Sequence, residues 1–292
     1  MFYFILNQPV NDSIGAQLAV LIEVLKKIKA ENKKYIIFDF SKIKFVYPVF
    51  ITSISSLIAY LKENGYEVYH SGINNSSYLQ TVFFPDGLKP DELPLWETTL
   101  NNYSGKTYLP VINFSASRKK EETEIRENVL SKINSLLENN LKLNSNYKTA
   151  VSYIISEITD NIIDHSGVGR GWISAQYYPT KQFLDICIID TGKTILGSYK
   201  DNNIAGINND FDAIEKAISG VSTKDKERGF GMRTSKKLIE EGLNGKFVLI
   251  SGSAMLFNNE LTQFPVKWEG TILALRMPQG IANFDYSHFL LV

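Results

Sequence analysis

The chain has 292 residues, of which 44% are hydrophobic, and its 31 Lys and Arg residues balance its 31 Asp and Glu residues. A neutral chain lacks the basic excess with which proteins bind nucleic-acid phosphates or anionic membrane surfaces, so neither partner is expected. The longest uncharged stretch, between Lys44 and Lys62, is shorter than the roughly 20 residues of a membrane-spanning helix. Cys187, the single cysteine, lies in an apolar run and is predicted to be buried. We therefore expect a soluble, cytoplasmic protein with no disulfide bond within the chain.

Residues 1–95 alternate strand and helix patterns, which favours a small α/β domain. Short apolar runs predict the strands, and apolar residues at helical spacing predict the helices. The predicted strands cover 2–6, 35–40 and 66–69, and the predicted helices cover 14–28 and 51–61.

The N-terminal pattern resembles a STAS domain, the fold of anti-sigma factor antagonists. The resemblance rests on Ile36–Ser41, on Phe45-Val46 before a helix, and on Glu63–Val68. That family carries a phosphoacceptor serine at a strand-to-helix turn, where this chain reads Tyr47-Pro48-Val49-Phe50, so phosphorylation at this position is not expected. The nearby residues Ser53, Ser55 and Ser56 are interpreted as surface residues of the following helix.

Residues 85–117 are rich in Pro, Gly, Ser and Asn and predict a domain boundary. Within this segment we expect a linker over 96–117, followed by a second domain over 118–292. That domain is predicted to begin with an amphipathic helix over 118–139.

The first candidate site in the second domain is a helix over 151–166 with one apolar side and one polar side. The polar side gathers Glu157, Asp160, Asn161, Asp164 and His165. A carboxylate and an amide one turn apart can hold a hydrated Mg²⁺ and orient a water or hydroxyl group. The alternative is an ordinary solvated helix face.

Two glycine motifs follow. Asp190-Thr191-Gly192-Lys193-Thr194 comes directly after a predicted strand over 184–189, where a carboxylate can accept a hydrogen bond from an exocyclic amine such as that of adenine. Gly229-Phe230-Gly231-Met232 opens a predicted helix, whose free N–H groups suit a phosphate. Taken singly, each is also compatible with an ordinary turn.

In this order, and with a strand beginning Gly270-Thr271, these motifs resemble the GHKL superfamily of ATPases, also called the Bergerat fold. The resemblance implies a two-layer α/β sandwich that binds ATP or ADP with Mg²⁺. It makes Glu157 the catalytic base, Asn161 the Mg²⁺ ligand and Asp190 the reader of adenine. The other implied nucleotide-binding residues are Asp164, His165, Gly192, Thr194, Lys224, Arg228, Gly229, Phe230, Gly231, Met232 and Thr271.

The chain departs from the family pattern at two positions. Thr194 stands where the first glycine motif usually has a second glycine, and Met232-Arg233 replaces the usual continuation of the second motif. Residues 196–228 correspond to the ATP lid and are predicted to be mobile.

Within the superfamily, the chain is most similar to anti-sigma factor kinases of bacteria. None of its three histidines lies in a phosphoacceptor motif of sensor kinases, and few residues follow Pro278. The resemblance implies ATP binding, formation of a homodimer and phosphorylation of a serine on a STAS protein or sigma-type regulator. Two alternatives stay open: a non-catalytic, nucleotide-dependent interaction module, and a slow ATPase switch.

Overall fold

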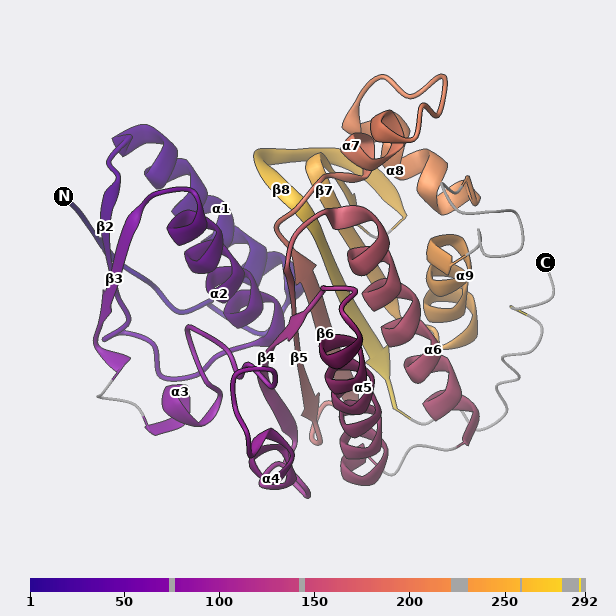
Figure 1. The fold of residues 1–292 in the computed structure, drawn as a ribbon, viewed down its shortest axis with the longest axis horizontal. Coiled ribbons are helices and arrows are strands. Elements are labelled where there is room, and N and C mark those ends of the chain that lie inside the picture. The colour runs from indigo at the N-terminus through magenta and orange to yellow at the C-terminus, as the bar shows by residue number, and fades with distance from the viewer. Residues whose placement is uncertain (74–76, 142–144, 222–230, 258, 280–288, 290–292) are drawn as a thin grey trace.

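The computed structural model describes residues 1–73, 77–141, 145–221, 231–257, 259–279 and 289. The described elements form four layers in the order sheet, helices, sheet, helices (Figure 1). The two sheets have three and five strands. The predicted class, a mixed α/β protein with a two-layer α/β sandwich in its C-terminal part, is confirmed.

The first sheet is parallel, in the order β1 (Phe2–Ile5), β2 (Tyr35–Asp39) and β3 (Glu67–Ser71). Helix α1 (Ile14–Glu31) connects β1 to β2, and helix α2 (Pro48–Glu63) connects β2 to β3. Connections between parallel strands are right-handed, so two successive crossovers in one direction place both helices on the same face. Figure 1 shows α1 and α2 on one side of this sheet, and none of the described helices lies on the other side.

The second sheet has the order β4-β5-β6-β8-β7, and its neighbouring strands are antiparallel. Helices α5 (Lys120–Leu141), α6 (Ser145–Asn161) and α9 (Gly231–Lys237) lie on the side of this sheet that faces away from α1 and α2 (Figure 1). The strands are β4 (Tyr108–Ser115), β5 (Arg170–Tyr178), β6 (Phe183–Asp190), β7 (Lys246–Phe257) and β8 (Glu260–Pro278). Alternate residues of β6 face opposite layers: Ile188 joins the core under α6, whereas Cys187, buried as predicted, and Ile189 join the core beside α2.

Helix α2 lies between the two sheets and is buried along most of its length. One continuous apolar core joins Phe50 and Ile54 of α2 to Trp172 of β5 and Ile272 of β8. No helix among the described residues is both long enough and apolar enough to cross a lipid bilayer.

The interpretation of the α2 serines as surface residues is wrong. Ser53, Ser55 and Ser56 are each at most 1% exposed, because the second sheet covers the side of the helix that a free domain would show to water. Ser53 and Ser56 donate hydrogen bonds to backbone carbonyls of their own helix. The Thr52 hydroxyl lies 2.6 Å from the Ser174 hydroxyl of β5, so one polar side chain of α2 binds the neighbouring sheet directly.

The segment predicted as a linker, 96–117, contains helix α4 (Trp96–Asn101) and strand β4, an edge strand of the second sheet. Its Pro and Gly residues favoured a loop, but β4 is buried because α5 covers it. A short helix α3 (Ser77–Thr81) precedes this segment.

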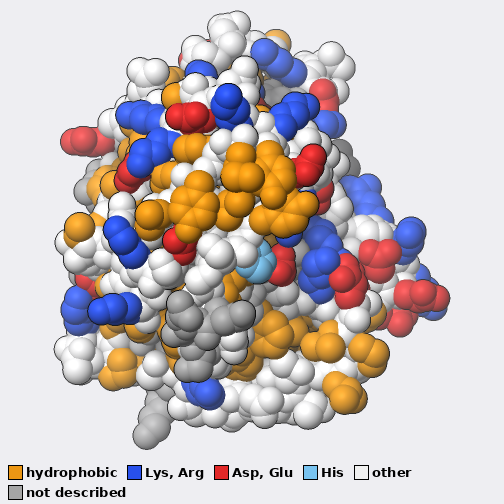
Figure 2. Space-filling view, turned by 90° about the vertical axis from the view of Figure 1, so that its left-hand side faces the viewer, with side chains coloured by type: hydrophobic (Ala, Val, Ile, Leu, Met, Phe, Trp, Pro, Cys, Tyr) orange, Lys and Arg blue, Asp and Glu red, His pale blue; other side chains and the backbone are white. Residues whose placement is uncertain are grey.

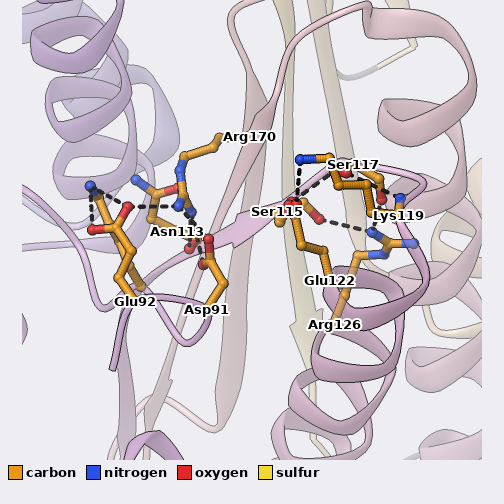
Figure 3. Close-up of polar contacts among 10 residues, drawn as sticks. Asp91, Glu92, Asn113, Ser115, Ser117, Lys119, Glu122, Arg126 and Arg170 are labelled. Atoms are coloured by element: carbon orange, nitrogen blue, oxygen red, sulfur yellow. Dashed lines mark hydrogen bonds and ion pairs between the residues drawn. The ribbon is translucent and has the colours of Figure 1, made fainter. Parts of the chain in front are cut away.

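Two arginines tie the surroundings of β4 together (Figure 3). Arg170 forms a two-point ion pair with Asp91 and also contacts Glu92, which attaches the preceding loop to β5. Arg126 of α5 donates to the carbonyl oxygens of Ser115 and Ser117 at 3.0 and 2.7 Å. Burial lowers the pKa of Arg126, although nearby carboxylates oppose this shift.

The described part of the predicted lid is folded. It contains helix α7 (Ile195–Asp201) and helix α8 (Asp210–Ser219). Asp210 accepts hydrogen bonds from the backbone N–H and the hydroxyl of Ser253 on β7, at 2.9 and 2.8 Å. Helix α8 therefore contacts the sheet through Asp210, and the mobility of the lid stays a prediction.

A buried ion pair lies where the N-terminal layers meet the second sheet. Arg276 of β8 contacts both carboxylate oxygens of Asp185 on β6 at 2.7 Å and donates to the Asp12 carbonyl oxygen at 2.6 Å. Its guanidinium also lies over the Phe183 ring, 3.9 Å from the ring centre. Burial raises the pKa of Asp185 to about 6, although Arg276 opposes that shift.

Replacing Arg276 with Met tests this junction. The Arg276→Met variant leaves the Asp185 carboxylate buried without its partner, and we expect the free energy of unfolding to fall by about 3–5 kcal/mol at pH 8. The loss shrinks toward pH 4, because a protonated Asp185 needs no counter-charge and the unfolded chain also binds that proton. Urea unfolding at pH 4, 6 and 8 measures the difference.

The matched control for Arg276→Met is Lys267→Met, which removes an exposed cation paired with Glu269. An exposed pair contributes about 0–1 kcal/mol, so this control should unfold nearly as wild type does. An equal effect of the two substitutions would contradict the role given to Arg276.

Candidate nucleotide-binding site

A cavity opens between α6 and the sheet on one side and the lid helices α7 and α8 on the other. Its empty space amounts to about 850 Å³, a figure that includes the part open to solvent. Its lining combines apolar walls with a few polar groups: Ile158, Asn161, Ile162, His165, Ser166, Ile188, Asp190, Lys193, Thr194, Ile195, Ser198, Tyr199, Ala217, Val221, Gly231, Met232, Thr271 and Leu273.

Asp190, the last residue of β6, is the buried acidic group of this cavity and is only 3% exposed. One carboxylate oxygen accepts a hydrogen bond from the Gly192 N–H at 2.9 Å. Burial raises the pKa of Asp190 to about 7, and the hydrogen bonds from Gly192 and Thr271 oppose this rise. Thr271 lies directly opposite Asp190 on β8. The carboxylate is thus fixed in place with room to accept a further donor from the cavity.

Two glycines make this arrangement possible. A Cβ atom on Gly192 would lie 2.2 Å from the Ser166 carbonyl oxygen, and one on Gly270 would lie 2.5 Å from a carboxylate oxygen of Asp190. Gly270 also has a φ of +89°, which side-chain-bearing residues rarely adopt. A larger residue at position 192 would displace the Ser166 backbone, and one at position 270 would displace Asp190.

The polar residues of α6 reach the cavity through an irregular helix end. After Asn161 the helix continues as a π-helical turn over Ile162–Ser166, a type of irregularity frequent at functional sites. Asn161, directly before this turn, and His165, within it, both line the cavity.

Glu157 lies one turn before Asn161, against the start of α9. A Cβ atom on Gly231 would lie 1.9 Å from a Glu157 carboxylate oxygen, so a larger residue there would require the Glu157 side chain to shift. The structure therefore brings Glu157 next to the C-terminal end of the second glycine motif, with Gly231 and Met232 among the lining residues.

Not every predicted residue is in the cavity. Asp164 is exposed and forms an ion pair with Arg118 at 2.9 Å, and it is not among the lining residues. The charge of Asp160 favours the charged form of Arg126 on α5. The polar side of the predicted helix therefore faces α5 as well as the cavity. Lys224, Arg228, Gly229 and Phe230 lie outside the described residues.

Thr194 takes the place of a glycine because it caps α7. Its hydroxyl oxygen accepts a hydrogen bond from the Gly197 N–H at 3.1 Å, and its φ of −65° is available to any residue. The side chain stabilises the first turn of the lid instead of disturbing the motif.

Sequence reasoning missed the lid side of the cavity. Tyr199 is buried and its hydroxyl donates to the Val221 carbonyl oxygen at 2.5 Å, which ties α7 to the end of the described lid. Lys193 lines the cavity and pairs with Asp201 of α7 at 2.5 Å. Lys193 stands inside the first glycine motif and could have been proposed from that position. Tyr199 carries no such signal, because only the packing of α7 brings it to the cavity.

The donor set fits a purine nucleotide. Ile158, Ile188 and Leu273 offer apolar walls for a flat ring, and the Asp190 carboxylate can accept a hydrogen bond from the exocyclic amine of adenine. Asn161 offers an amide oxygen to a cation. Mg²⁺ usually takes few protein ligands and keeps water and phosphate oxygens around it, so one amide suits a metal that arrives with a nucleotide.

Residues 146–279 match the family model described as Histidine kinase-, DNA gyrase B-, and HSP90-like ATPase. This match supports a GHKL-type ATPase domain in the C-terminal part of the chain. Domains of this family bind ATP with Mg²⁺, as the cavity chemistry also indicates.

The matched segment begins within α6 and leaves out β4 and α5, although both belong to the same sandwich. No curated protein gives a significant match to the sequence.

Asp190→Asn is expected to make the free protein more stable and a weaker binder of nucleotide. In wild type the raised pKa means that the folded state keeps a proton that the unfolded chain releases, so stability falls as pH rises from about 4 to about 7. Because the variant does not undergo this loss, its free energy of unfolding above pH 7 should exceed that of wild type by about 2–4 kcal/mol. Adenosine affinity should fall about tenfold or more, because a charged acceptor is lost.

Thermal unfolding at pH 5 and 8 and calorimetric titration with adenosine measure the two effects of Asp190→Asn. Asp86→Asn, at an exposed carboxylate, is the control and should change neither. A variant that is less stable at pH 8 than wild type would contradict the account of Asp190.

Proposed function

We propose that this protein binds ATP·Mg²⁺ in the cavity between α6 and the lid and transfers the γ-phosphoryl group to a serine or threonine of another protein. The observation that carries the proposal is that Asp190 and Asn161 line one cavity, while the Glu157 carboxylate lies beside Gly231, which also lines it. All four residues belong to the segment that matches the ATPase family. Asp190 reads the base, Asn161 holds the cation, and Glu157 stands beside the glycine motif that suits phosphates.

In the proposed reaction, the Glu157 carboxylate accepts the proton of the acceptor hydroxyl. The hydroxyl oxygen forms a bond to the γ-phosphorus while the bond between that phosphorus and the β–γ bridging oxygen breaks, which leaves ADP. Mg²⁺ bound with the nucleotide supplies neutralising charge, and Asn161 orients it. The chain's own contribution is to fix the base, the amide and the adenine reader on rigid elements.

The acceptor belongs to a different molecule. The hydroxyl groups of α2, the helix on which a STAS-like acceptor would stand, are buried and lie beside the face of the second sheet away from the cavity. The N-terminal α/β unit is proposed to be STAS-like in fold and to act as a rigid part of the enzyme, with a separate STAS protein or sigma-type regulator as the partner.

Asn161→Ala tests the cation site. We expect the affinity for ATP·Mg²⁺ to fall about tenfold or more, while the affinity for adenosine stays within about twofold, because Asp190 and the apolar walls are untouched. Calorimetric titrations with both ligands, with and without Mg²⁺, measure this. Absence of ATP binding to wild type would overturn the proposed function.

Glu157→Gln tests the base. This substitution keeps the shape of the side chain and removes its ability to take a proton, so ATP should still bind while turnover falls by about 10²–10⁴. The assay uses γ-labelled ATP with the protein alone and with an array of serine- and threonine-containing peptides.

The same assay separates the alternatives. Label on a peptide supports the kinase, free phosphate indicates an ATPase switch, and neither product indicates a nucleotide-dependent interaction module. Equal turnover by wild type and Glu157→Gln would contradict the assignment of Glu157.

A further inference from the structure

The face of the first sheet that points away from α1 and α2 carries an apolar patch open to solvent (Figure 2). Tyr3 is 52% exposed, Ile5 41% and Tyr69 51%, while Tyr35 and Ile37 are partly exposed. The Tyr35 and Tyr69 rings lie 5.2 Å apart, so the patch is continuous across strands. We call these five residues the outer sheet patch.

The strand register arranges this face in three rows. The central row is Tyr3, Ile37 and Tyr69, in neighbouring strands. Two residues earlier along the strands lie Tyr35 and Glu67, and two residues later lie Ile5, Asp39 and Ser71. The two carboxylates of the face thus stand at opposite ends, on either side of the apolar row.

The size of the patch fits a modest protein interface. Its exposed side chains add up to roughly 400 Å² of apolar surface, at the level where patches on single chains mark contact sites. A standard interface takes about 800 Å² from each partner, so the polar rim must supply the remainder. A contact of this size is expected to be reversible and dependent on concentration rather than permanent.

We propose that the outer sheet patch binds the same patch of a second copy of this chain. The two copies are related by a two-fold axis that lies between the facing sheets and parallel to both. This axis passes over Ile37 and runs at right angles to the strands. This rotation places the central row of one copy on the central row of the other. It also places each outer row on the opposite outer row of the partner copy.

This rotation makes the charges of the two copies complementary, which favours a second copy as the partner. Asp39 then faces the hydroxyl of the second copy's Tyr35, and Glu67 faces the hydroxyl of the second copy's Ser71. No carboxylate meets another carboxylate, and the apolar row meets only apolar side chains. Asp39 is already fixed for this contact, because it accepts hydrogen bonds from the Tyr3 hydroxyl at 2.5 Å and from the Ser41 N–H at 2.8 Å.

Two further features agree with this arrangement. The chain has no net charge, so two copies approach without long-range repulsion. The sheet lies at the opposite end of the layer order from the helices that line the cavity, so the association leaves the nucleotide site open (Figure 1). The proposal does not depend on nucleotide binding and can be tested without it.

The first test is sedimentation of the full chain over a range from about 1 to 200 μM. We expect a concentration-dependent dimer, and Tyr69→Lys should weaken it at least tenfold because a buried aromatic anchor is replaced by a charge. Leu95→Lys is the matched control, since Leu95 is 68% exposed and directly precedes α4, which lies beside α5 and apart from the first sheet (Figure 1). Thermal unfolding checks that both variants keep the fold.

The second test fixes the axis. Cys187 is buried and does not compete with an introduced surface thiol, so a short bismaleimide that spans about 8 Å can report on single cysteines. Ile37→Cys lies on the axis and should be linked to its own copy, because facing sheets pack about 10 Å apart with side chains between them. Ile5→Cys lies two residues away from the axis in both copies, about 13 Å apart along the strands, and should not be linked.

Each result decides the proposal. Dimers that respond to Tyr69→Lys and are linked only through Ile37→Cys support it. A chain that stays monomeric up to 200 μM overturns it and leaves the patch to a different partner. Dimers that are insensitive to Tyr69→Lys, or that are linked through Ile5→Cys alone, overturn the face or the axis.

Discussion

The burial of α2 between two sheets is the contact on which the rest of the structure depends. Phe50 and Ile54 pack into the same core as Trp172 of the second sheet, and Thr52 binds the Ser174 hydroxyl across that boundary. The N-terminal layers and the ATPase-like sandwich therefore share one core. With α1 and α2 holding the back of the second sheet, the cavity side of β6 and β8 is presented by a rigid support, which suits a site that must fix several groups precisely.

The buried Asp190 carboxylate destabilises the folded state when it is charged, and close backbone packing at two glycines holds it in place. Burial keeps the pKa of Asp190 near 7, far above its ordinary value, because few donors offset the loss of water around the carboxylate. Gly192 and Gly270 allow the backbone to close around that carboxylate. A buried carboxylate with a strongly raised pKa in a cavity is typical of functional sites.

The sequence motifs predicted several residues that line the cavity, but they did not predict which neighbouring residues point elsewhere. Asn161, His165, Asp190, Gly231 and Thr271 line one cavity, because motifs at strand ends and helix starts have nearly fixed local geometry. Asp164 shares a helical side with Asn161 in a regular helix, but it lies after the start of the π-helical turn and pairs with Arg118. Local periodicity cannot anticipate such a turn, because it responds to packing against other elements.

The sequence by itself determined the alternation of strands and helices, the zero net charge and the residue types of the glycine motifs. These properties follow from local spacing and from residue type. Only the tertiary structure decided that β4, which reads as part of a linker, is an edge strand of the second sheet, and that the α2 serines are buried. Among the described residues, it also leaves the outer face of the first sheet uncovered by a helix. The reason is the same in each case: burial depends on what packs against a segment from far along the chain, and a single strand or helix pattern carries no record of that partner.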